Sequence, residues 1–68
     1  MTLSARNHLN GTSEEIQLGD VVAHITVRVA GGLIESVITR RSAEEMALQQ
    51  GDVVTAVVKA TEVMISKP

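Results

Sequence analysis

The sequence predicts an all-β (mainly β) fold, a small barrel of five strands with one short helix between strands 3 and 4. Three observations lead to this expectation. Residues 21–29 alternate between apolar and polar side chains, and a period of two is typical of a strand with one buried face. Later segments are rich in β-branched residues and are separated by glycines at turn positions. A single helix-start motif interrupts this pattern.

The segment 21–29 has the clearest strand pattern. One face holds Val21, Ala23, Ile25, Val27 and Val29, and the other holds Val22, His24, Thr26 and Arg28. The Gly31-Gly32 pair that follows suits a tight hairpin turn, because glycine adopts positive φ freely. We therefore expect a further strand over residues 33–39.

The helix-start motif is Ser42-Ala43-Glu44-Glu45, which matches a capping box. In such a box Ser42 accepts from the backbone amide of residue 45, and the Glu45 side chain reaches back to the Ser42 amide. Gln50-Gly51 ends the predicted helix, with Gly51 in the left-handed conformation that glycine often adopts there.

The remaining segments complete a barrel. Residues 6–18 are expected to form the first strand, with a bulge or kink at Asn10-Gly11, and Gly19-Asp20 to form the turn after it. Residues 53–59 are strand-like, and residues 62–65 predict a last short strand. Strand, strand, strand, short helix, strand, short strand is the order of an OB-fold, a partly open five-stranded barrel.

The chain length predicts one domain over residues 1–68, with residues 1–3 and 66–68 frayed. A domain of 68 residues has a marginal core, and such domains usually need disulfides, a metal or self-association. The chain has no cysteine and only two histidines, whereas 44% of it is hydrophobic and none of it aromatic. We therefore expect a homo-oligomer that buries the aliphatic excess between subunits.

Charge and motif content exclude several classes of function. The formal net charge of −2 and the lack of aromatic side chains disfavour nucleic-acid binding, which needs a basic groove and stacking platforms. No apolar run approaches the roughly 20 residues of a membrane span, and the first residues do not resemble a signal peptide, so a cytoplasmic protein is expected. No activated nucleophile or acid–base pair is evident, which predicts that the protein is not an enzyme.

The N-terminal motif Ser4-Ala5-Arg6-Asn7, followed after three residues by Gly11, carries a family resemblance. Three further stretches fit the same family in order, namely 18–21 (LGDV), 37–39 (VIT) and 57–64 (VVKATEVM). From residue 3 to residue 65 the chain resembles the molbindins, the molybdate-binding modules of the transport-associated OB-domain superfamily. The resemblance implies a single molbindin-like OB domain that binds molybdate or tungstate.

Oxyanion chemistry can also be argued from the residues. A tetrahedral dianion needs convergent hydroxyl, amide and cationic donors, because hydrogen bonds to a charged acceptor are strong. Such donors occur in three clusters, which are Ser4 with Arg6, Thr39 with Ser42, and Lys59 with Thr61.

The resemblance assigns these residues to oxyanion sites between subunits. It implies that one subunit contributes Ser4, Ala5 and Arg6. Other ligands would come from the same or a neighbouring subunit, namely Thr39, Ser42, Lys59 and Ala60, and Thr61 could add its amide or hydroxyl. The resemblance also implies a hexamer, a trimer of dimers with more than one class of anion site. The bound ligand would be the oxyanion, with no organic cofactor and no direct protein–metal ligand.

Structural roles compete with these assignments. Ser42 also makes sense as a helix cap, and Lys59 as a lysine that guards a strand edge. Solvent exposure explains Arg40, Arg41 and His24. Three alternative functions stay open, which are an assembly or regulatory module without an anion site, an OB module for nucleic acid, and binding of a pterin cofactor. The last is disfavoured because aromatic contacts for a large heterocycle are lacking.

Overall fold

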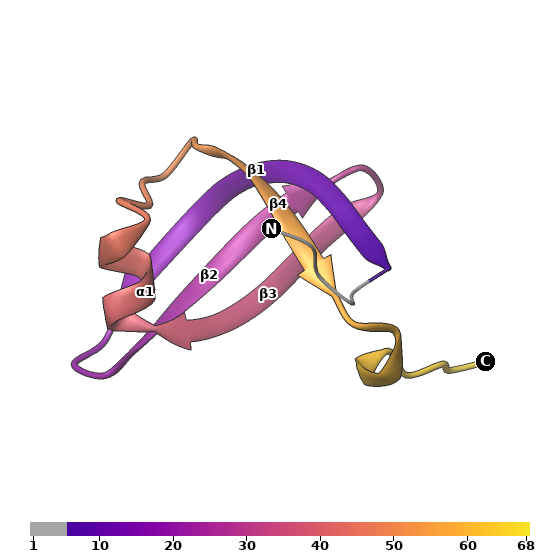
Figure 1. The fold of residues 1–68 in the computed structure, drawn as a ribbon. Coiled ribbons are helices and arrows are strands. Elements are labelled where there is room, and N and C mark those ends of the chain that lie inside the picture. Colours follow the sequence, from indigo (N-terminus) through magenta and orange to yellow (C-terminus); the bar gives the residue numbers. More distant parts are fainter. Residues whose placement is uncertain (1–5) are drawn as a thin grey trace.

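Four strands pair in one antiparallel sheet, in the order β3-β2-β1-β4, in the computed structural model, which describes residues 6–68 (Figure 1). A short helix α1 lies between β3 and β4, and a 3₁₀ helix η1 follows β4. The strands are β1 (Asn7–Leu18), β2 (Val22–Val29), β3 (Gly32–Thr39) and β4 (Val53–Val58), and the helices are α1 (Arg40–Glu45) and η1 (Ala60–Glu62). The all-β class is confirmed. Among the described residues, no helix is long and apolar enough to cross a membrane.

The alternation predicted for β2 is confirmed. Ala23, Ile25 and Val27 are buried on the inner face, and Ala43 of α1 packs with them. β2 has a hydrogen-bonded strand on each side, so its inner side chains are covered from both directions. The hairpin to β3 also lies where the glycines predict it. Val29 pairs with Gly32, and Gly31 in the turn has a φ of 92°.

The start of the helix differs from the prediction. Thr39, not Ser42, is the N-cap, and its Oγ1 accepts from the backbone amide of Ser42 at 3.0 Å. Thr39 and Ser42 are three residues apart, so either hydroxyl could cap a helix. Thr39 takes the role because it is the last, extended residue of β3 and the chain turns into α1 directly after it.

The helix also ends earlier than predicted, at Glu45. The amide of Leu48 donates to the Ala43 carbonyl at 3.1 Å and that of Ala47 to the Glu44 carbonyl at 3.0 Å, which is the bonding pattern of a Schellman motif. The left-handed position is Ala47, with a φ of 50°. Gly51 does have positive φ (92°), but in the turn that leads into β4.

The bulge in β1 lies at Glu14 and not at Asn10-Gly11, because the pairing with β2 shifts between Ser13 and Glu15. Gly11 has a different purpose. A Cβ atom on it would lie 2.4 Å from the backbone oxygen of Arg28, so the strands can approach this closely only at a glycine. The bulge places Glu14 against Arg28, whose guanidinium donates to it at 2.8 and 3.0 Å.

The fifth strand is not present within the described residues. Residues 60–62 form η1, and residues 63–68 continue without regular structure, away from the sheet (Figure 1). A strand needs an edge with which to pair, and this segment turns away from β3 and β4, the edge strands, which no other described strand covers. The apolar side chains of Met64 and Ile65 are therefore 93% and 89% exposed.

Candidate functional site

The pairing of β1 with β4 brings together two cations that are far apart in the sequence. The last pair in the register is Asn7 with Val58, so Arg6 and Lys59 are the next residues along the two strands. Both are exposed. The register therefore places Arg6 of the first predicted donor cluster and Lys59 of the third at the same end of the sheet.

These cations differ from the other arginines. Arg28, Arg40 and Arg41 each lie within 4 Å of a glutamate, at 2.8, 3.6 and 3.2 Å. Within residues 6–68, no carboxylate forms an ion pair with Arg6 or Lys59. A cation without a carboxylate partner keeps its charge and its donors available for an external anion.

The turn that follows Lys59 adds backbone donors. Lys59 is the N-cap of η1, and its carbonyl accepts from Glu62 at 2.9 Å. The first amides of a helical turn, here those of Ala60 and Thr61, have no partner inside the turn. Lys59, Ala60 and Thr61 therefore present an ammonium group, two amides and a hydroxyl on an exposed segment.

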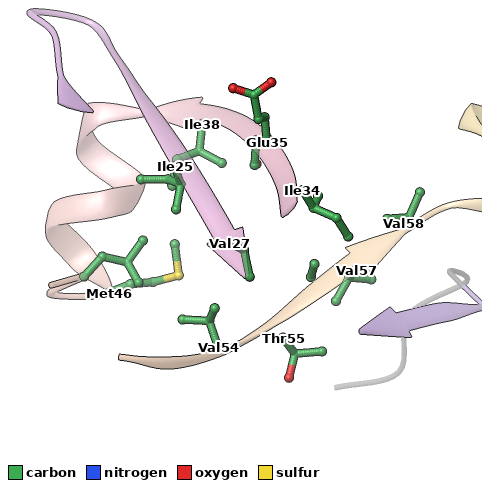
Figure 2. Close-up of a pocket in the computed structure, with 13 residues that line it drawn as sticks. Ile25, Val27, Ile34, Glu35, Ile38, Met46, Val54, Thr55, Val57 and Val58 are labelled. Carbon is green, nitrogen blue, oxygen red and sulfur yellow. The ribbon is translucent and has the colours of Figure 1, made fainter. Parts of the chain in front are cut away.

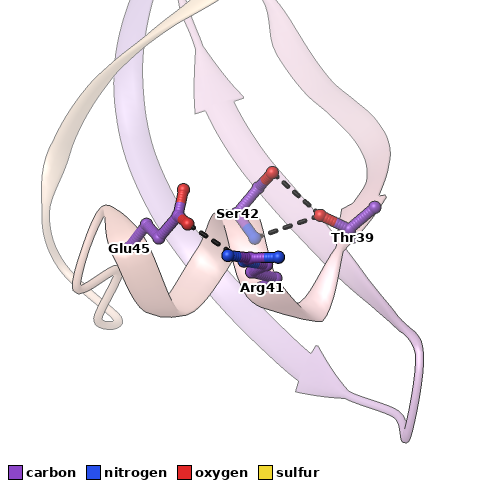
Figure 3. Close-up of polar contacts among 4 residues, drawn as sticks. All are labelled: Thr39, Arg41, Ser42 and Glu45. Carbon is purple, nitrogen blue, oxygen red and sulfur yellow. Dashed lines mark hydrogen bonds and ion pairs between the residues drawn. The ribbon is translucent and has the colours of Figure 1, made fainter.

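Thr39 and Ser42 lie at the opposite end of the sheet, where β3 runs into α1 (Figure 3). Thr39 pairs with Val22, near the end of β1, whereas Val58 pairs with Asn7 at its start. Figure 1 shows α1 and η1 on opposite sides of a molecule that is 35 Å in its longest dimension. Within one chain, Thr39 and Ser42 therefore lie too far from Lys59 to contact the same anion.

The two hydroxyls also have different bonding. Thr39 Oγ1 accepts from the Ser42 amide and donates to Ser42 Oγ at 2.8 Å (Figure 3). The Thr39 proton is thereby used within the chain, and the Ser42 hydroxyl keeps its own proton to donate. Ser4 and Ala5, the other predicted ligands, lie outside the described residues.

Sequence reasoning missed an apolar cavity of about 320 Å³ between the two uncovered edges of the sheet. Figure 2 shows side chains from both sides of this seam. They include Ile25, Val27, Ile34, Met46, Val54 and Val58. The sequence signal was the aliphatic excess without aromatic bulk, which predicted unfilled apolar surface but not its location. No group of three or more histidine, aspartate or glutamate side chains gathers elsewhere in the described chain to hold a metal ion.

Comparison with known proteins shows the family of the chain. Residues 3–65 match the model of the TOBE domain family. The chain belongs to the TOBE domain family. It is 44% identical over 66 residues to molybdenum-pterin-binding protein 2 of Clostridium pasteurianum, covering 96% of this chain and 97% of the relative. This confirms the resemblance to the molbindins.

Solved structures give the same result for this TOBE domain. A molybdate-binding protein from Sporomusa ovata superposes with a TM-score of 0.93 at 42% identity, covering 98% of this chain and all of that one. MopII from Clostridium pasteurianum, in an apo form, gives a TM-score of 0.89 at 42% identity, covering 97% of this chain and all of that one. ModG, a cytoplasmic molybdate-binding protein solved with molybdate bound, gives 0.82 at 41% identity, and the match covers 88% of this chain and 43% of ModG.

Proposed function

We propose that this TOBE domain binds molybdate or tungstate between subunits of a homo-oligomer and serves in intracellular storage or homeostasis of molybdenum. The observation that carries the proposal is the placement of Arg6 beside Lys59, both without a carboxylate partner in the described chain. The molybdate-binding relatives, at 42% identity over nearly the whole chain, support the identity of the ligand.

The site chemistry fits a tetrahedral dianion. Two cations offset its charge, and the amides of Ala60 and Thr61 add directional donors, as does the Thr61 hydroxyl. Ser4 and Ala5 are proposed to contribute from the N-terminal motif. The same ligands do no redox or acid–base work, so we assign the protein no catalytic activity, no organic cofactor and no direct bond from a side chain to the metal atom.

The second hydroxyl cluster supports a second class of site. Thr39 and Ser42 lie too far from Lys59 to share its anion within one chain, so we assign them to an anion held with a neighbouring subunit. A dimer that shares only one end of the sheet can complete only one of these two classes of site. Sites at both ends therefore require a larger assembly. A hexamer built as a trimer of dimers meets this requirement.

Burial supports self-association independently. The buried apolar side chains of the described residues are only Ala23, Ile25, Val27 and Ala43. Large aliphatic side chains such as Val37, Val53 and Ile65 stay exposed, and the seam between β3 and β4 is open. A surface of this kind indicates an interface, because soluble monomers rarely expose large apolar patches. We place the assembly in the cytoplasm, as for ModG, with no nucleic-acid or membrane partner.

Equilibrium dialysis against molybdate, tungstate and sulfate tests the proposal. We expect uptake of the first two, and an increase in melting temperature with molybdate, since a ligand of the folded assembly stabilises it. The double variant Arg6→Ala/Lys59→Ala should lose at least a hundredfold in affinity while it stays folded. The matched control Arg41→Ala/Lys67→Ala removes the same charges elsewhere and should bind like the wild type.

The competing function is an assembly or regulatory module without an anion site. Absence of molybdate and tungstate uptake at micromolar concentrations, with a monodisperse oligomer, would favour it. Unchanged affinity in the Arg6→Ala/Lys59→Ala variant would instead show that the anion binds elsewhere.

A further inference from the structure

Ser13 is the sole buried polar side chain among residues 6–68, with an exposed fraction of 0%. Its Oγ donates to the Gln49 carbonyl at 2.6 Å and accepts from the Asp52 amide at 3.1 Å. Its backbone is bonded to the same turn, since its amide donates to the Asp52 carbonyl at 2.9 Å and its carbonyl accepts from Gly51 at 2.7 Å. Ser13 thus holds β1 against the turn that leads into β4.

The turn is also braced from within. The Asp52 carboxylate accepts from the Gln49 amide at 2.9 Å, and the Asp52 amide donates back to the Gln49 carbonyl at 3.1 Å. The hydrogen bonds of Asp52 therefore set the position of Val53, the next residue and the first of β4. Water does not compete with the bonds to Ser13, because its side chain is buried.

β4 itself specifies its pairing with β1 weakly. Its inner residues are Val54, Ala56 and Val58, and its outer residues are Val53, Thr55 and Val57. If β4 slipped by two residues, each inner position would still hold a small aliphatic side chain, so packing distinguishes the two registers poorly. The inner residue Val54 faces Gly11, which has no side chain to read the register. Thr55 donates to Asn10 at 3.1 Å, but this bond is exposed and exchanges readily for water.

The register of β4 decides the geometry of the proposed anion site. Pairing runs from Thr12 with Val53, next to Ser13, to Asn7 with Val58, and only this register sets Lys59 opposite Arg6. A slip of one residue turns every side chain of β4 to the other face. A slip of two moves Lys59 and the amides of Ala60 and Thr61 by about 7 Å along the strand, away from their position opposite Arg6.

We propose that Ser13, together with Asp52, fixes the register of β4 and is thereby a positioning residue for the oxyanion site at Arg6 and Lys59. Ser13 does not touch the anion. It acts over the length of β4, by setting which residue of that strand faces the start of β1. This inference rests on the proposed function for the identity of the site, although the register itself can be measured without any ligand.

Disulfide cross-linking measures the register, because the chain contains no cysteine of its own. The pair Thr12→Cys/Val53→Cys lies opposite in the observed register, and the pair Thr12→Cys/Thr55→Cys reports a two-residue slip. In the parent chain we expect the first pair to oxidise and the second to stay reduced. With Ser13→Ala added, the yield of the first should fall at least threefold and the second should become cross-linked.

Affinity for molybdate provides the second readout. Ser13→Ala should weaken binding at least tenfold in equilibrium dialysis, although it removes no group that contacts the anion. The matched control is Ser36→Ala, the same change on the inner side of β3, which should leave both affinity and cross-linking as in the parent. If Ser13→Ala does not fold, Asp52→Ala is the milder variant, since it removes only the carboxylate that accepts from Gln49, and the same results are expected.

Two results would overturn the inference. One is a Ser13→Ala protein that cross-links only in the observed register. The other is a shifted cross-link with unchanged molybdate affinity, which would separate the register from the site. Failure of the wild-type protein to bind molybdate would refute the proposed function instead, and the cross-linking pattern would then decide alone whether Ser13 sets the register.

Discussion

β2 and β4 share an alternating burial pattern but have opposite surroundings. Both alternate with a period of two and are rich in valine. β2 lies between β1 and β3, and its inner side chains Ala23, Ile25 and Val27 are at most 5% exposed. Among the described strands, β4 pairs with β1 alone, and its Val53 is 87% exposed. The same pattern therefore makes a core strand where both neighbours come from the chain, and an unfinished edge where one neighbour is missing.

The C-terminal segment, like β4, is poorly covered by the rest of the chain. Val63, Met64 and Ile65 are apolar and exposed, as are Met46 and Val57 of the open seam. The chain thus divides into a covered region, made of β1, β2, β3 and α1, and an uncovered region, made of β4 and residues 59–68. The covered region has the core of the folded chain, whereas the uncovered region has Lys59, Ala60 and Thr61 of the proposed ligands and the most exposed apolar side chains.

The largest expected effect is on the free energy of unfolding, when an isoleucine is replaced by alanine in each of the two regions. Ile25→Ala in the covered region should lower the free energy of unfolding by about 3 kcal/mol, because it removes buried apolar contacts from the core. Ile65→Ala in the uncovered region should cost less than about 0.5 kcal/mol in dilute protein, because the side chain is exposed there. Urea denaturation at low protein concentration measures both. Equal losses in the two variants would contradict the division.

The second effect concerns assembly. Met64→Asp/Ile65→Asp should weaken self-association at least a hundredfold, about 2.7 kcal/mol, because charges would enter an apolar interface. Light scattering across a dilution series measures the change in mass. The control Ser66→Asp/Lys67→Asp places carboxylates on the adjacent residues and should assemble like the wild type. Assembly that survives the first variant would show that residues 64 and 65 lie outside the interface.

The covered region could be predicted from the sequence, since its signals are local. The alternation over residues 21–29 gave the buried face of β2, and the glycines gave the hairpin to β3. The predicted position of the bulge in β1 was wrong, because the sequence alone allows a bulge at either Gly11 or Glu14. Only the approach of the Arg28 carbonyl distinguishes them.

The uncovered region could be predicted only in part. Residues 62–65 have a strand-like composition, but a strand also needs a partner edge, and local sequence contains no information on that edge. The adjacency of Arg6 and Lys59 depends on a register between segments about fifty residues apart, which is set by Ser13 and the turn at Asp52 rather than by the site itself. The motif therefore indicated candidate ligands without predicting which of them lie close together in the fold.

The cap of α1 should have an effect of intermediate size. Thr39→Ala removes the hydroxyl that accepts from the Ser42 amide and should lower the free energy of unfolding by about 1 kcal/mol. Ser42→Ala leaves that bond in place and should cost less than half as much. Chemical denaturation of the two variants compares them. A larger loss for Ser42→Ala would show that Ser42, as the sequence had predicted, is the more important cap.

The smallest effect should come from the boundary between the regions, where the chain leaves α1 for β4. Ala47 has a φ of 50°, and an L-residue with a side chain pays about 1–2 kcal/mol for the left-handed conformation. Ala47→Gly relieves this strain but adds freedom to the unfolded chain, so we expect a net gain of only about 0.5 kcal/mol. The melting temperature should rise slightly, with no change in molybdate affinity, because Ala47 lies outside both proposed sites. Gly51→Ala is the reciprocal test, since Gly51 has a φ of 92° in open space and should lose stability through backbone strain alone. A loss of stability in Ala47→Gly would mean that the Schellman motif depends on the methyl group of Ala47 more than on its backbone geometry.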